Sequence, residues 1–188
     1  DGTVDVTFVF DGSALEDTLL VAFETLYTEE KEVGIHAEIE DDAQTVYLPK
    51  IRTNAKDGIT DIDHTEALEK ATIIDTVSYS SLLPGKEYTV SGTLMNKATG
   101  EAVLIDGKPI TASTTFTAEK AEGSVDIVFE FDASAIAGTT VVAFEKVTYK
   151  GVEVGVHADI TDEDQTVYIP DVHTTATATD TEDHVTGR

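Results

Sequence analysis

Apolar and polar residues alternate along most of this chain, which is the pattern of half-buried β-strands. The segments that carry it are rich in β-branched and aromatic residues, and turn sequences separate them. They span residues 72–79, 86–95, 110–118, 124–132, 139–149, 152–160 and 165–170. Only residues 64–71 have a composition typical of a helix. Short strands at this spacing predict an all-β fold, an immunoglobulin-like antiparallel β-sandwich.

The sequence also repeats itself. Residues 20–49 return as residues 141–170, at an offset of 121 residues and without a gap. Between residues 2–49 and 123–170, 25 of 48 positions are identical, and His36 and Gln44 correspond to His157 and Gln165. A period of about one small domain indicates tandem modules rather than a solenoid of short repeats.

The repeat divides the chain into three parts. Residues 1–49 match only the last third of the second copy, so we expect them to be the C-terminal fragment of a preceding repeat. A complete module is expected over residues 50–170. Residues 171–188 are expected to open a following repeat, because Thr174 corresponds to Thr53. The chain is therefore predicted to be a piece of a tandem array, in which neighbouring repeats of the same polypeptide are the partners of this module.

Composition narrows the possible partners. The 188 residues carry a formal net charge of −25, which repels nucleic acid and anionic lipid alike. There is no cysteine, so a disulfide framework and a thiolate metal site are both excluded. No apolar run is long enough for a membrane span. With 40% hydrophobic residues the chain still has enough apolar side chains to build a core.

Strand periodicity identifies the candidate chemistry, because residues two apart share a face of a strand. Four predicted strands each carry one polar residue on the otherwise apolar face: Thr53, Asp75, Glu145 and Gln165. A buried polar group without a partner costs roughly 1–3 kcal/mol, and an isolated buried charge costs more. We therefore expect the four side chains to meet in a single buried cluster.

This set of groups is suited to acyl transfer. Thr53 supplies a nucleophilic oxygen and Gln165 an amide carbon. Two close carboxyl groups in a dry site do not both ionise, so one can accept the threonine proton while the other donates. The predicted product is an intramolecular ester, formed with release of ammonia. The sequence alone does not decide which acid accepts the proton and which donates it.

Several motifs carry a family resemblance. They are Arg52–Thr53, the sequence DTVSY at Asp75–Tyr79, VAFE at Val142–Glu145, and His157 followed eight residues later by Gln165–Val167. Together they resemble the VaFE or T-Q repeat domain, which occurs in the stalks of Gram-positive surface adhesins. The likeness covers all of the proposed complete module.

The resemblance implies a role for each residue. Thr53 and Gln165 would be the linked pair of an autocatalytic ester bond, and Glu145 and Asp75 the acids that handle the proton. His157 would be a supporting hydrogen-bond donor, although strand periodicity places it on the polar face of its strand. The resemblance implies no cofactor and no metal. It further implies an extracellular, cell-wall-anchored protein whose modules gain mechanical, thermal and proteolytic stability from the ester.

Two other function classes stay open on the sequence. The chain could be a ligand-binding module of an adhesin, although no aromatic cluster supports this. It could instead carry a Lys to Asn isopeptide bond, as related pilin-like domains do, but its inward positions hold Thr and Gln. An enzyme that acts on other molecules is disfavoured, because a buried nucleophile consumed by its own product cannot turn over. We expect a single self-catalysed reaction.

Overall fold

A computed structural model describes residues 2–179 of the chain. Residues 50–170 form two antiparallel sheets that pack face to face. One sheet has the strand order β11-β6-β5, and the other has the order β10-β7-β12-β13, with β14 also paired to β12. The strands are β5 (Lys50–Asp57), β6 (Ala71–Ser80), β7 (Glu87–Asn96), β10 (Thr111–Thr117), β11 (Gly123–Phe131), β12 (Thr140–Tyr149), β13 (Val152–His157) and β14 (Thr166–Tyr168). The predicted all-β antiparallel sandwich is confirmed.

The core lies between the two sheets. In the central strand β6, buried residues alternate with partly exposed ones from Ala71 to Val77. Ile73 and Val77 are fully buried, and Phe129 of β11 and Val90 and Leu94 of β7 are equally inaccessible. The alternation read from the sequence is therefore the alternation between core and solvent.

Short turns connect the strands where the sequence carries turn signals. The hairpin between β8 (Leu104–Ile105) and β9 (Lys108–Pro109) turns at Asp106 and Gly107, both with positive φ. Lys150 and Gly151 do the same between β12 and β13. Two successive positive φ angles match the right-handed twist of the flanking strands, which is why glycine occupies the second position in both hairpins.

The helical composition of residues 64–71 does not produce a helix. This segment has no helical turn, and its backbone pairs with other elements. The amide of Thr65 donates to the carbonyl of Tyr168, and Leu68 accepts a bond from the amide of Ala133. Tertiary pairing of these backbone groups outweighs the helical propensity of Glu, Ala and Leu.

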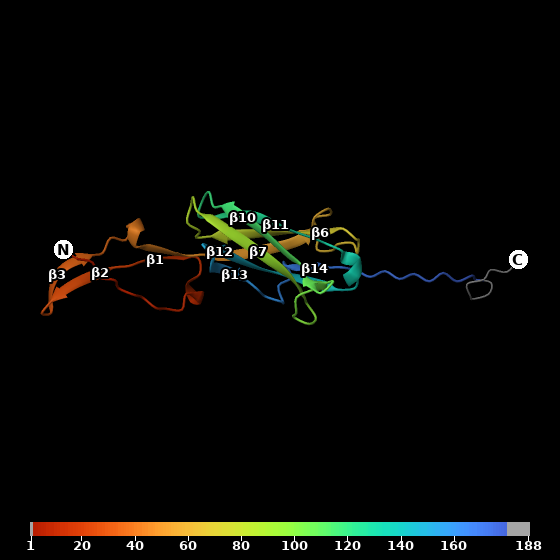
Figure 1. Ribbon diagram of the computed structural model, residues 1–188, viewed down its shortest axis with the longest axis horizontal. Coiled ribbons are helices and arrows are strands. Elements are labelled where there is room, and N and C mark those ends of the chain that lie inside the picture. The colour runs from red at the N-terminus through yellow and green to blue at the C-terminus, as the bar shows by residue number, and fades with distance from the viewer. Residues whose placement is uncertain (1, 180–188) are drawn as a thin grey trace.

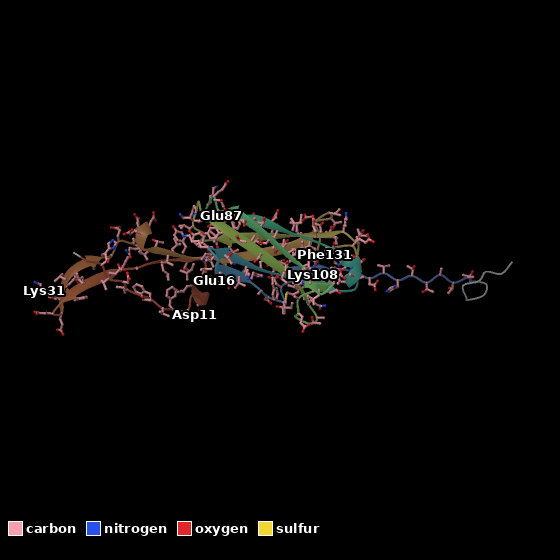
Figure 2. The ribbon with its side chains drawn as sticks, viewed as in Figure 1. Asp11, Glu16, Lys31, Glu87, Lys108 and Phe131 are labelled. Carbon is pink, nitrogen blue, oxygen red and sulfur yellow. The ribbon has the colours of Figure 1, made fainter. Side chains whose placement is uncertain are left out.

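The N-terminal residues form a narrow extension at one end of the sandwich (Figure 1). It contains two ribbons: β1 (Thr18–Val21) with β4 (Thr45–Leu48), and β2 (Glu24–Thr28) with β3 (Lys31–His36). Only Pro49 separates β4 from β5, and Glu16 lies where the extension meets the module (Figure 2). Apolar residues of this extension are exposed, including Phe8 at 60% and Leu26 at 63%, because no second sheet covers them.

The chain leaves the module at the opposite end. Residues 171–179 run away from the sandwich without forming a strand (Figure 1). The predicted start of a third repeat, residues 171–188, lies partly outside the described residues. The first strand of the module, β5, therefore follows the N-terminal extension at one end, and the last strand, β14, leads to residues 171–179 at the other end.

Candidate functional site

The four polar positions predicted from strand periodicity are all buried. Thr53 is 7% exposed, Glu145 2%, and Asp75 and Gln165 0%. Thr53 lies in β5 and Asp75 in the adjacent β6, while Glu145 lies in β12 of the other sheet and Gln165 directly precedes β14. The two sheets thus place the four side chains against one another across the core.

One carboxylate oxygen joins the nucleophile to the leaving group. The hydroxyl of Thr53 donates to Oε2 of Glu145 over 3.0 Å. The side-chain amide nitrogen of Gln165 donates to the same oxygen over 2.6 Å. Glu145 therefore contacts both the oxygen that would attack and the nitrogen that would leave.

Burial changes the acidity of both carboxyl groups. Desolvation raises the pKa of Asp75 to about 6. Desolvation, followed by the neighbouring charge of Asp75, raises the pKa of Glu145 to about 10. Two carboxylates in one dry site repel each other, so the first proton to bind is held tightly. Near neutral pH the pair accordingly carries one proton, and Glu145 holds it more strongly than Asp75.

Several buried oxygens of the site lack a hydrogen-bond partner among the described residues. They are both carboxyl oxygens of Asp75, Oε1 of Glu145 and Oε1 of Gln165. Unpaired buried acceptors are rare in folded proteins, because each costs about 1–3 kcal/mol. A proton carried by the acid pair supplies a donor to oxygens that are otherwise all acceptors.

Backbone hydrogen bonds hold Gln165 between the two sheets. The amide of Ala55 in β5 donates to the carbonyl of Asp164, and the amide of Ala143 in β12 donates to the carbonyl of Gln165. Ala55 lies two residues after Thr53, and Ala143 two residues before Glu145. The same backbone contacts therefore fix the strand of the nucleophile, the strand of the acid and the glutamine in register.

The structure places His157 on a different face of its strand from the one that the sequence pattern indicates. It lies directly opposite Glu145 in the β12–β13 pair and is half-buried, whereas the next residue back, Val156, is 49% exposed. A β-carbon on Gly155 would meet the side chain of Ile51, so this face of β13 is turned toward β5. The assignment of His157 to an outward polar face is wrong, because β13 has a bulge at Val154, between the pairs Val147–Gly155 and Thr148–Glu153, which shifts its register.

The partner of His157 is Asp162, which sequence reasoning missed. Nε2 of His157 lies 2.8 Å from Oδ2 of Asp162, and neither atom belongs to the four-residue cluster. Oδ1 of Asp162 accepts the amide of Asp164, and its carbonyl accepts the hydroxyl of Thr166. The pair thus braces the turn that carries Gln165. The predicted hydrogen bond from His157 into the cluster stays a prediction.

A signal for Asp162 was present in the repeat. Asp41 follows His36 by five residues, as Asp162 follows His157. In the N-terminal extension His36 and Asp41 lie 3.1 Å apart, and Glu24 is again paired with His36 across the strands. This local arrangement therefore forms even where the rest of a module is absent.

Lys97 is a second residue that the sequence did not reveal. Its Nζ lies 2.6 Å from Oε1 of Glu163 and 2.9 Å from the hydroxyl of Thr166. These contacts tie the end of β7 to the residues on both sides of Gln165. No periodic pattern identifies Lys97, because its role depends on a contact 66 residues away in the sequence.

Comparison with known proteins identifies the family. The family model of the T-Q ester bond containing domain matches the sequence of this chain twice, over residues 1–48 and 49–169. The chain belongs to this family. The Thr and Gln of the cluster, Thr53 and Gln165, both lie inside the second match. No curated protein matches the chain.

Two solved structures share the fold of this T-Q domain chain. Both are of a bacterial adhesin from Mobiluncus mulieris, described as containing intramolecular disulfide, isopeptide and ester bond cross-links. One has 17% sequence identity and a TM-score of 0.52, the other 16% and 0.53. In each case the match covers 66% of this chain and 58% of the adhesin. At this identity the likeness establishes the shared fold alone.

Three further findings describe the site and its surroundings. Within residues 2–179, the buried polar side chains include no lysine, and no three metal-ligating side chains gather in one place. No helix in that part of the chain is long and apolar enough to cross a membrane. The polar chemistry of the core is thus that of hydroxyl, carboxyl and amide groups.

Proposed function

We propose that this chain is a stalk module of a bacterial surface adhesin, and that an ester bond between Thr53 and Gln165 cross-links it. The observation that carries the proposal is the position of Glu145 Oε2, within hydrogen-bond distance of both Thr53 Oγ1 and Gln165 Nε2. A general base must reach the proton that it removes, and a general acid must reach the leaving group. One oxygen meets both requirements.

The reaction is a single acyl transfer. Thr53 Oγ1 attacks the side-chain carbonyl carbon of Gln165 and gives its proton to Oε2 of Glu145. The proton held on the other oxygen of Glu145 moves to the ionised Asp75 as this happens, so the acid pair becomes neutral and the negative charge passes to the carbonyl oxygen of Gln165. Oε2 then delivers its proton to the departing nitrogen, the C–N bond breaks, and ammonia leaves. The C–O bond of the ester remains.

The acid pair also serves the developing oxyanion. Oε1 of Gln165 is buried without a partner in the unreacted arrangement, so negative charge on it would be costly there. The proton on the Asp75–Glu145 pair is a donor for that oxygen. A donor that stabilises charge present only in the transition state lowers the activation barrier without stabilising the ground state.

The reaction consumes its own nucleophile, so the module is not an enzyme that turns over. The benefit lies in the product. β5 receives the chain from the N-terminal extension and β14 leads it away at the other end (Figure 1). Tension on the stalk would enter and leave through these two strands, and an ester between them would carry the load past the core.

We further propose that the module is part of a tandem array on the cell surface. Two successive matches to one family description support a tandem array with residues 1–49 and 50–170 as neighbours. The likeness to an adhesin with ester bonds supports an extracellular location on the cell surface. Anchoring to the cell wall of a Gram-positive bacterium is part of the proposal. In such an array the neighbouring repeats are the partners of this module.

Intact mass spectrometry tests the ester. The purified chain should be lighter than its sequence by one ammonia, and Thr53→Ala or Gln165→Ala should restore the full mass. Thr76→Ala is the matched control, because Thr76 lies on the outer face of β6 and bonds Asp126. Peptide mapping should join the Thr53 peptide to the Gln165 peptide. An unmodified mass after prolonged incubation at neutral pH would refute the proposal.

A further inference from the structure

A glycine lies beside the catalytic glutamate. Gly92 of β7 is directly opposite Glu145 in the β7–β12 pair. A β-carbon added to Gly92 would lie 2.6 Å from Cδ1 of Ile127 and 2.6 Å from Cζ of Phe129. Such distances are far below van der Waals contact. The two apolar side chains therefore fill the notch that the missing side chain leaves.

The same side chains reach the second acid. Ile127 of β11 is directly opposite Asp75 in the β6–β11 pair. Side chains of directly opposed residues lie next to each other on one face of a sheet. Ile127 is 1% exposed and Phe129 is 0% exposed. An apolar wall thus extends from the flank of Asp75 on one sheet to the flank of Glu145 on the other.

We propose that Gly92 is a positioning residue for ester formation, because its notch lets Ile127 and Phe129 seal the two carboxyl groups from water. The catalytic part of this proposal rests on the proposed function, whereas the sealing of the acids does not. Neither apolar residue offers a polar atom, so the wall acts only through exclusion of water. A larger residue at position 92 would force the wall away from the acids.

Exclusion of water keeps one proton on the acid pair at neutral pH. Desolvation is the first cause of the raised pKa of both Asp75 and Glu145. The other ionisable groups that act on the pair are His157, opposite Glu145 on β13, and Asp126 of β11, which lies opposite Thr76 on the outer face of the sheet. His157 lowers the pKa of Asp75 and Asp126 raises it. Neither group belongs to the wall, so their effects persist when the wall is changed.

Two nearly isosteric variants separate polarity from packing. Ile127→Val and Ile127→Thr both remove the Cδ1 atom that enters the notch, but only threonine places a hydroxyl beside Asp75. The titration of both carboxyl groups should be followed by carbon NMR in the Thr53→Ala chain, where no ester can form. We expect Ile127→Thr to lower the lower pKa of the pair, that of Asp75, by about one pH unit relative to Ile127→Val, which is a tenfold change in proton affinity.

In the chain that retains Thr53, the rate of ester formation should respond in the same direction. The lower limb of the pH–rate profile should move to lower pH in Ile127→Thr and stay in place in Ile127→Val. Identical titrations in the two variants would overturn the proposal. A wild type that forms no ester would refute the proposed function, but the titration in the Thr53→Ala chain would still decide whether the wall seals the acids.

A pair of glycine variants decides the matter if Ile127→Thr does not fold. Gly92→Ala displaces the wall. Gly123→Ala is the matched control, since its β-carbon would lie 2.5 Å from the hydroxyl oxygen of Tyr79, a similarly short contact at the exposed start of β11. We expect Gly92→Ala alone to lower the higher pKa of the pair. Equal carboxyl titrations in the two alanine variants would show that Gly92 has no special role.

Discussion

Replacement of Thr53 by alanine should strongly destabilise the module. The ester would join residues 53 and 165, and so would close a loop of 112 residues. By the chain-entropy relation for cross-links, closing a loop of this size removes unfolded-state entropy worth about 4–5 kcal/mol. Strain in the cross-linked state reduces such values, so we take this as the upper part of the range.

The hydroxyl itself matters only in a comparison with an unlinked chain, because the ester has consumed it in the linked wild type. In the unlinked chain Thr53 donates one buried hydrogen bond to Glu145, and removal of such a bond costs about 1–2 kcal/mol. Glu145→Gln distinguishes the two contributions, since it keeps Thr53 and Gln165 but removes the acid that the reaction needs. Thr53→Ala and Glu145→Gln should both lack the ester, and both should lose most of the stability that the ester provides.

Differential scanning calorimetry measures the effect. For a domain of this size, 1 kcal/mol corresponds to roughly 3–5 °C in Tm, so Thr53→Ala should melt about 10–20 °C below the wild type. Thr76→Ala, which removes a threonine hydroxyl from the outer face of β6, should change Tm by only a few degrees. Each sample should be checked by intact mass. A wild type that carries the ester yet melts within about 2 °C of Thr53→Ala would refute the loop-closure argument.

The remaining predictions concern load, pH and the flanking residues. In single-molecule pulling, Thr53→Ala should gain roughly 370–400 Å of extension that the linked wild type keeps closed; equal gains would exclude a load-bearing ester. In the unlinked Thr53→Ala chain, the raised pKa values of Asp75 and Glu145 mean that the folded state binds protons more tightly than the unfolded state. Its stability should therefore fall as pH rises from about 4 to about 10, and adding Glu145→Gln should flatten a urea-denaturation series over that range. Asp162→Ala, which frees the turn before Gln165, should slow ester formation several-fold in a mass-spectrometric time course, and an unchanged rate would show that the turn needs no brace. Peptides that contain Gln44 should stay unmodified in this chain, and a cross-linked Gln44 peptide would contradict the requirement for a threonine strand opposite it.

The sequence by itself determined the strands and the contents of the core. Alternation placed Thr53, Asp75, Glu145 and Gln165 on inward faces, and all four are buried. This works because the side-chain period of a strand is two, so a polar residue in an apolar series stands out without any knowledge of the partner strand. The internal repeat showed in addition that Glu145, His157 and Gln165 correspond to Glu24, His36 and Gln44.

Only the tertiary structure decided how these groups meet. No pattern along the chain shows that one oxygen of Glu145 accepts from both Thr53 and Gln165, because that contact joins β5, β12 and the residue before β14. The inward position of His157 follows from a bulge in β13. Residues 64–71 do not form a helix, because their backbone pairs with β14 and Ala133. The notch at Gly92 has meaning only against Ile127 and Phe129, which approach from the opposite sheet. Periodicity is a local property of the backbone, whereas register, bulges and packing between sheets depend on contacts far apart in sequence.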